Sequence, residues 1–180
     1  MHGSTQPLSL GVRRSAPHAM TRAQIHEQFV SEFHDGSSVA TVTASDLATV
    51  ERELSIVLPE SYRSFILTHG TVRASSLLDL VVDLDAELWA ISDFIAPAEI
   101  VSDSRLYWSG GMSDQLVGFA GDDMGNMFCL RRSSVSSSRP DDAPVLFFDH
   151  EFCDHNRQLA DSFDSWLFSY LKLKRPELTR

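Results

Sequence analysis

The spacing of apolar residues changes twice along this chain of 180 residues, and the order of those changes limits the folds open to it. Up to Gly70 the apolar residues recur every three or four positions, as in amphipathic helices. From Leu78 to Phe148 they alternate or form short runs, as in strands. From Leu159 the helical spacing returns. This order predicts an α+β fold: a single mixed, mostly antiparallel sheet packed with N-terminal helices and a C-terminal helix.

Local start and stop signals support three helices in the N-terminal part. Asp35-Gly36 ends the first helix, and Ser45 is placed to cap the second. Pro59 ends the second helix and opens the third, which ends at Gly70. Their apolar stripes comprise Ile25, Phe29, Val30 and Phe33; Leu47, Val50 and Leu54; and Tyr62, Phe65 and Ile66.

Three patterns in the middle of the chain predict strands. In residues 78–85 apolar residues alternate with aspartates, which indicates a half-buried strand with an acidic outer face. Residues 115–120 and 126–131 flank a loop bounded by glycines, which indicates a hairpin. The unbroken apolar run at 145–148 indicates a central strand covered on both faces.

The last helix has the clearest pattern, because apolar residues recur at helical spacing from Leu159 to Leu171. Asp154 or Asn156 is placed to cap its start. Since Phe65, Phe147 and Trp166 each lie on the apolar side of a predicted element, we expect these three side chains to share one core.

Charge narrows the choice of partner. The net charge is −10, and residues 79–164 hold 17 acids against five arginines, a local balance of −12. Such a surface would repel phosphate, so we expect no direct nucleic-acid partner. It favours a basic partner, although acidity also serves solubility alone.

Length and composition indicate one domain. Residues 1–20 are rich in Ser, Gly and Pro and are expected to be a mobile leader, which leaves residues 21–180 as a single domain. No apolar run is long enough to cross a bilayer, and the leader lacks the apolar core of a signal peptide. Cys129 and Cys153 are too few for a disulfide framework, so we expect reduced thiols and a cytoplasmic location.

A few polar residues are candidates for catalytic or metal-binding chemistry, and each also has a plausible structural role. His150, Cys153 and His155 stand close enough in sequence to suggest a metal site, but their spacing matches no known zinc module. A Cys153–His nucleophile is disfavoured because the nearby acids would raise the thiol pKa. Asp122 and Asp123 have three possible roles: acid–base catalysis, stabilising the tight turn, or forming an acidic patch that binds a partner. We therefore expect no enzyme activity, no metal and no cofactor.

Residues 51–70, ERELSIVLPESYRSFILTHG, resemble the entry motif of the SUKH superfamily. The matching positions are Leu54, Ile56, Leu58-Pro59, Tyr62-Arg63, Phe65 and Gly70, with Ser55 where Gly is common and His69 where Asn is common. Similar pieces follow in order: 116–125 resembles the central hairpin, 144–151 the last strand, and Ala160, Phe163, Trp166 and Leu167 the closing helix. The resemblance covers about residues 40–171.

This superfamily includes fungal cell-wall assembly regulators and many bacterial immunity proteins. The resemblance implies stoichiometric binding to a cognate toxin, often a nuclease, that is encoded nearby. A scaffold or regulator outside toxin systems is the alternative. In either case the partner is a protein and no membrane is involved.

A basic partner would meet acidic side chains and aromatic anchors. The two tryptophans are equally compatible with core packing, since tryptophan is largely buried in either role. The expected partner-binding residues are Asp83, Asp85, Glu87, Trp89, Trp108, Asp122, Asp123 and Glu151.

Overall fold

The computed structural model describes residues 20–74, 77–86, 88–132, 139–175 and 178. The expected leader lies outside the described residues except for Met20, and so does Glu87. Among the described helices, none is long and apolar enough to span a bilayer.

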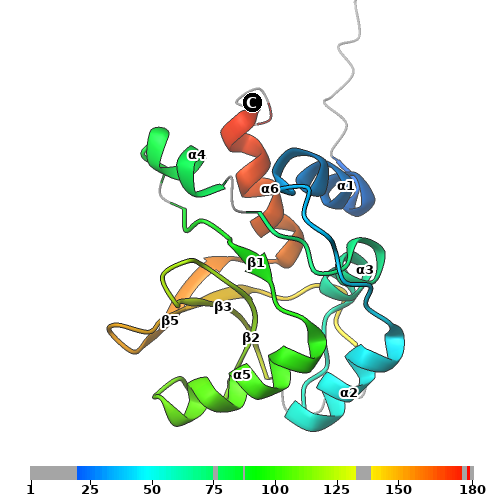
Figure 1. Cartoon of the computed structure of the whole chain (residues 1–180), viewed down its shortest axis with the longest axis vertical. Coiled ribbons are helices and arrows are strands. Elements are labelled where there is room, and N and C mark those ends of the chain that lie inside the picture. Colours follow the sequence, from blue (N-terminus) through cyan, green and yellow to red (C-terminus); the bar gives the residue numbers. More distant parts are fainter. Residues whose placement is uncertain (1–19, 75–76, 87, 133–138, 176–177, 179–180) are drawn as a thin grey trace, which may run out of the picture.

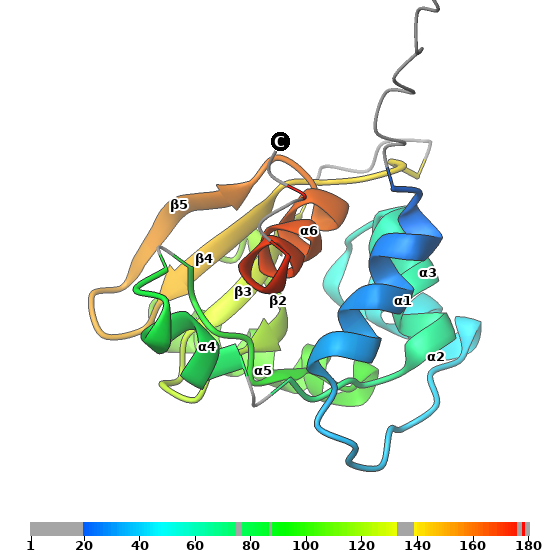
Figure 2. The same cartoon turned by 90° about the horizontal axis from the view of Figure 1, so that it is seen from above.

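The described residues form an α+β fold around one antiparallel sheet whose strand order, β1-β2-β3-β4-β5, is the chain order. This confirms the predicted fold class (Figures 1 and 2). The strands are β1 (Asp93–Phe94), β2 (Leu116–Gly121), β3 (Met127–Arg131), β4 (Val145–Asp149) and β5 (Asp154–Ala160). The helices are α1 (Arg22–Phe33), α2 (Ala44–Leu54), α3 (Glu60–His69), α4 (Leu77–Asp83), α5 (Pro97–Ser109) and α6 (Phe163–Lys174).

Helices cover both faces of the sheet. Phe128 and Phe147 are cross-strand partners, and the ring of Phe128 lies 5.0 Å from that of Trp166 in α6. Their neighbours along the strands point the other way, and there Phe148 meets Tyr107 of α5 at 6.0 Å. Figure 2 shows α6 over the sheet with α1 beside it. The apolar run at 145–148 is therefore covered on both sides, as predicted.

The expected core is confirmed. Phe65, Phe147 and Trp166 are each at most 1% exposed. Phe94 lies 4.7 Å from Phe65 and 6.2 Å from Trp166 between ring centroids. Phe128 connects Trp166 to Phe147, so ring contacts join all three side chains.

The helix boundaries of the N-terminal part follow the sequence signals with two shifts, because α2 starts after Thr43 and already ends at Leu54, before Pro59. Gly70 ends α3 as predicted, with φ 70°, and a Cβ at this position would collide with the Ala40 carbonyl. The cap of α2 is Thr43 rather than Ser45, because the Thr43 hydroxyl accepts from Asp46 N in a capping box. Ser55, which stands where the superfamily commonly has Gly, ends α2 in the left-handed region at φ 50°.

The prediction of a strand at 78–85 is wrong, because this segment forms α4 and the turn after it. A half-buried strand would bury Leu78, Val82 and Leu84 together, yet they are 44%, 67% and 51% exposed. Leu77 instead anchors the helix in the core. The edge of the sheet is formed by β1, whose Asp93 bridges to Arg73.

The start of the last helix was also predicted wrongly. Leu159 belongs to β5, and α6 begins at Phe163. The cap is Ser162, whose hydroxyl accepts from Ser165 N, and neither Asp154 nor Asn156. The sequence of β5, DHNRQLA, lacks the apolar alternation that would have marked it as a strand.

Candidate partner-binding face

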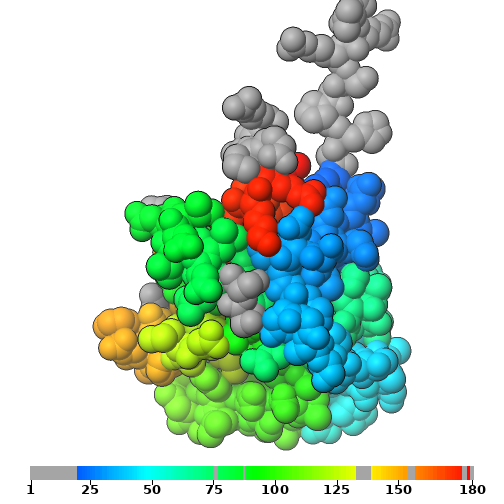
Figure 3. All heavy atoms as spheres, turned by 45° about the horizontal axis from the view of Figure 1, so that its top comes forward, coloured from blue at the N-terminus to red at the C-terminus, as the bar shows by residue number. Residues whose placement is uncertain are grey.

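Four segments lie side by side on one face of the molecule: α4, the β2–β3 turn, the β4–β5 turn and α5 (Figure 3). We call residues 77–86, 106–111, 121–126 and 149–153 the hairpin-end face. Asp83 and Asp85 belong to its α4 segment, Asp122 and Asp123 to the β2–β3 turn, and Glu151 to the β4–β5 turn. Five expected partner-binding acids thus share one face, although Asp83 ends a helix and Asp85 lies in the turn after it, and neither is on the outer side of a strand.

Side-chain hydrogen bonds hold the β2–β3 turn in shape. The Asp122 carboxylate accepts from Met124 N at 2.9 Å and from the backbone and side-chain nitrogens of Asn126, each at 2.8 Å. Asp122 therefore has a structural role in the turn. Its neighbour Asp123 is exposed and makes no ion pair with any described residue.

Asn126 also connects the two turns. Its Oδ1 accepts from His150 N at 3.1 Å and lies 3.0 Å from His150 Nδ1. The β4–β5 turn is held in the same way as its neighbour, since Asp149 Oδ1 accepts from the backbone nitrogens of Glu151 and Phe152. The two turns therefore form one connected unit.

Apolar side chains gather on this face. Of the eight large apolar side chains that are exposed in the described residues, six belong to it. Phe152 is 75% exposed and Met124 is 72% exposed at the tips of the two turns. Exposed apolar patches are typical of protein interaction sites. The six are Leu78, Val82, Leu84, Leu106, Met124 and Phe152.

The same face is acidic. Its four segments contain no lysine or arginine. Among the described residues, Asp123 and Glu151 lack a cationic partner, and both are exposed. The acids on this face are Asp79, Asp83, Asp85, Asp122, Asp123, Asp149 and Glu151. Exposed apolar groups among uncompensated negative charges suit a basic, partly apolar partner.

The two tryptophans are partly packed rather than free anchors. Trp89 lies against Phe147, 4.8 Å between ring centroids, and the Arg157 guanidinium covers its ring at 3.8 Å. Trp108 Nε1 donates to the Leu116 carbonyl at 2.7 Å. Both side chains thus stabilise the sheet, with part of each still accessible.

A pocket of about 360 Å³ opens between the end of α5, the end of β4 and the β4–β5 turn. The Tyr107 hydroxyl donates to the Gly125 carbonyl at 2.9 Å and connects α5 to the β2–β3 turn. This pocket could not be predicted from the sequence, because no helix was expected at 97–109 and no local pattern brings this segment to the β4–β5 turn. Its lining residues are Leu106, Tyr107, Ser109, Gly110, Phe148 and His150.

The cysteines do not converge on a site in the described part of the chain. Cys129 is buried in β3, where burial raises its thiol pKa. Cys153 is exposed in the β4–β5 turn, with its Sγ 3.8 Å from the His150 carbonyl. The side chain of His155 lies outside the described residues. In the part that is described, no three His, Cys, Asp or Glu side chains are grouped to hold a metal ion.

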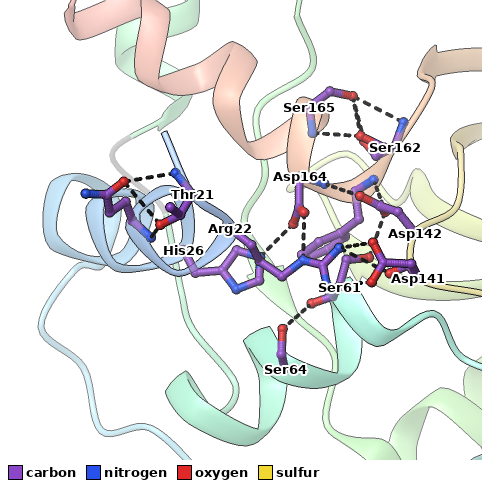
Figure 4. A network of polar contacts seen from close by, with 12 residues as sticks. Thr21, Arg22, His26, Ser61, Ser64, Asp141, Asp142, Ser162, Asp164 and Ser165 are labelled. Atoms are coloured by element: carbon purple, nitrogen blue, oxygen red, sulfur yellow. Dashed lines mark hydrogen bonds and ion pairs between the residues drawn. The ribbon is translucent and has the colours of Figure 1, made fainter. Parts of the chain in front are cut away.

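A separate polar network joins α1 to α6 (Figure 4). His26 is 3% exposed, and its Nε2 lies 2.8 Å from Asp164 Oδ1. Arg22 bridges Asp164 and Asp141, with 2.8 Å to each carboxylate. A His–Asp pair could suggest acid–base chemistry, but this imidazole is enclosed by packing and its partner also binds Arg22. The arrangement is that of a structural clamp between the two ends of the domain.

The clamp predicts a pH-dependent stability. Burial acts to raise the pKa of Asp164, but hydrogen bonds from His26 and Arg22 outweigh it and lower the pKa below its ordinary 3.8. A lowered carboxyl pKa stabilises the fold above about 3.8 and loses this contribution as the pH falls further. Asp164→Asn should cost about 1–2 kcal/mol at neutral pH, with the difference from wild type shrinking below about pH 3.8. Urea unfolding across this range tests it, and a difference independent of pH would contradict the assignment.

The five-stranded antiparallel sheet, enclosed by helices from both ends of the chain, defines an α+β domain of the superfamily that residues 51–70 resemble. The chain belongs to the SMI1 / KNR4 family (SUKH-1), whose model matches residues 41–169. The match includes the whole sheet and both hairpin turns, while α1 precedes it. No curated protein matches the chain.

Proposed function

We propose that this protein is a bacterial immunity protein that neutralises a cognate toxin by stoichiometric binding in the cytoplasm. It catalyses no reaction and needs no metal or cofactor. The observation that carries the proposal is the hairpin-end face, where six exposed apolar side chains lie among acids that no lysine or arginine of the same face offsets.

The physical argument has two parts. An acidic face attracts a basic partner over a distance and increases the rate of encounter. Apolar side chains that lose their exposure on contact then slow dissociation. A toxin that acts on nucleic acid must itself present a basic surface to phosphate, so a nuclease suits this face.

Charge reversal on this face tests the proposal. The double variant Asp123→Lys with Glu151→Lys should slow association with the toxin domain of the neighbouring gene by about tenfold at low salt, with a weaker salt dependence. Neither carboxylate makes an ion pair with a described residue, so folding stability should be little changed. Stopped-flow mixing gives the rates, and growth on co-expression with the toxin gives the neutralisation.

The matched control reverses Glu27 and Asp161, which are exposed and lie elsewhere. Glu27 is on α1, and Asp161 follows Ala160, which pairs with Val145 at the end of β4 away from the turn. This variant should bind nearly as fast as wild type. Equal slowing by both double variants would mean that net charge alone steers the encounter. A toxin that the wild-type protein neither binds nor neutralises would refute the immunity function and favour a regulator or scaffold.

A further inference from the structure

We infer that the pocket between α5 and the β4–β5 turn receives one apolar side chain of the partner, flanked in the partner's chain by basic residues. The inference rests on the proposed function and deepens it, because it states the chemistry of the segment that the hairpin-end face recognises. Its test uses short peptides and not the toxin, so the two proposals can fail separately.

The size and lining of the pocket favour a single side chain. At about 360 Å³ it stands at the lower end of the range for ligand sites, roughly 300–1,000 Å³. Phe148 is buried and Tyr107 half-buried, whereas Leu106 is 67% exposed and free to close over an occupant. An aromatic or aliphatic side chain in such a recess is the usual anchor of a protein interface.

Hydrogen bonds already hold the walls in place. Tyr107 donates to the Gly125 carbonyl, and His150 is fixed by Asn126. The His150 ring lies against Gly125, since a Cβ there would come within 3.4–3.6 Å of three ring atoms. Because α5, the β2–β3 turn and the β4–β5 turn are connected before binding, little conformational freedom is lost when the pocket is filled.

The charge around the pocket determines which residues should flank the apolar side chain in the partner. The pKa of the Tyr107 phenol is raised, first by burial and then by the negative charges of Asp103 and Asp122, so both carboxylates act on this wall. Asp149 and Glu151 flank His150 in the sequence. An apolar side chain between two lysines or arginines fits the apolar lining and the negative charge around the pocket. The same side chain between two acids would be repelled by that charge.

Three capped tripeptides test the inference on the full chain: acetyl-Lys-Phe-Lys-amide, acetyl-Lys-Ala-Lys-amide and acetyl-Glu-Phe-Glu-amide. Titration is followed by the backbone amide signals in NMR. The first peptide should shift the signals of residues 106–111 and 148–150 saturably at millimolar concentration. The other two should bind about tenfold more weakly, because each lacks one of the two required features.

A blocking variant and a matched control locate the site. Ser109→Trp fills the pocket, while Ser102→Trp places the same bulk two helical turns earlier on α5. Both serines are exposed and donate to the carbonyl three residues before them, so the two substitutions disturb the helix alike. Lys-Phe-Lys binding should be lost in Ser109→Trp and kept in Ser102→Trp, with unchanged melting temperatures. Absence of saturable shifts, equal binding of all three peptides, or equal binding to both variants would overturn the inference.

Discussion

Replacing Trp166 with alanine is expected to lower the free energy of unfolding by about 3–5 kcal/mol, a large part of the stability of an ordinary domain. Trp166 is 1% exposed at the centre of the core. Its ring is surrounded by those of Phe94, Phe119, Phe128, Phe163 and Tyr170. Alanine would leave a cavity that several rigid rings cannot fill. Urea or guanidinium unfolding measures the loss.

Trp166→Phe provides the control. The indole Nε1 is buried without a hydrogen-bond partner among the described residues, so phenylalanine keeps much of the ring packing and removes an unsatisfied donor. Its cost should therefore be well below that of alanine. If the two variants were equally destabilised, or if alanine cost less than about 1.5 kcal/mol, Trp166 would not be the centre of the core.

Asp142→Ala is expected to have the second-largest effect, about 2–4 kcal/mol, because it leaves several donors unpaired at once. Asp142 Oδ1 accepts from Ser61 Oγ at 2.7 Å, from Ala143 N at 2.8 Å and from Phe163 N at 2.8 Å. One carboxylate thus connects α3 to the first turn of α6 (Figure 4). Its negative charge also interacts favourably with the dipole at the N-terminus of α6.

The neighbouring Asp141→Ala is the matched control. The Asp141 side chain is 83% exposed and pairs with Arg22, so its removal should cost at most about 1 kcal/mol. Comparable losses for the two variants, measured by denaturant unfolding, would show that charge at this loop matters more than the hydrogen bonds of Asp142.

The fold was largely predictable where local chemistry decides it. Gly70 ended a helix and Gly125 marked a hairpin, because few other residues tolerate such backbone positions. The strand prediction for segment 78–85 failed because leucine and valine at four alternate positions are also compatible with a short, exposed helix. No strand among the described residues is available to pair with this segment. β5 was missed because an edge strand depends on pairing with β4 and not on a pattern of its own.

The candidate site was predictable in its charge and not in its shape. Asp123 and Glu151 could be named from the acidity of the middle region, but that the two turns touch depends on Asn126 reaching His150, 24 residues away. Exposure of Leu106, Met124 and Phe152 is likewise a tertiary property. The sequence also left open the roles of Asp122, Trp89 and Trp108, which their hydrogen bonds and stacking decide.

The clamp between α1 and α6 has a consequence for the order of folding. The sheet joins strands in chain order, so each pairing links neighbouring strands of the sequence and can form early. Arg22 and His26, by contrast, meet Asp164 across 142 and 138 residues of chain. Such distant contacts carry a large loop-closure entropy, so we expect α1 to dock late and to be among the first elements to detach in native-state fluctuations. The sheet and its two turns can therefore stay folded while α1 briefly detaches from α6 at the other end of the domain.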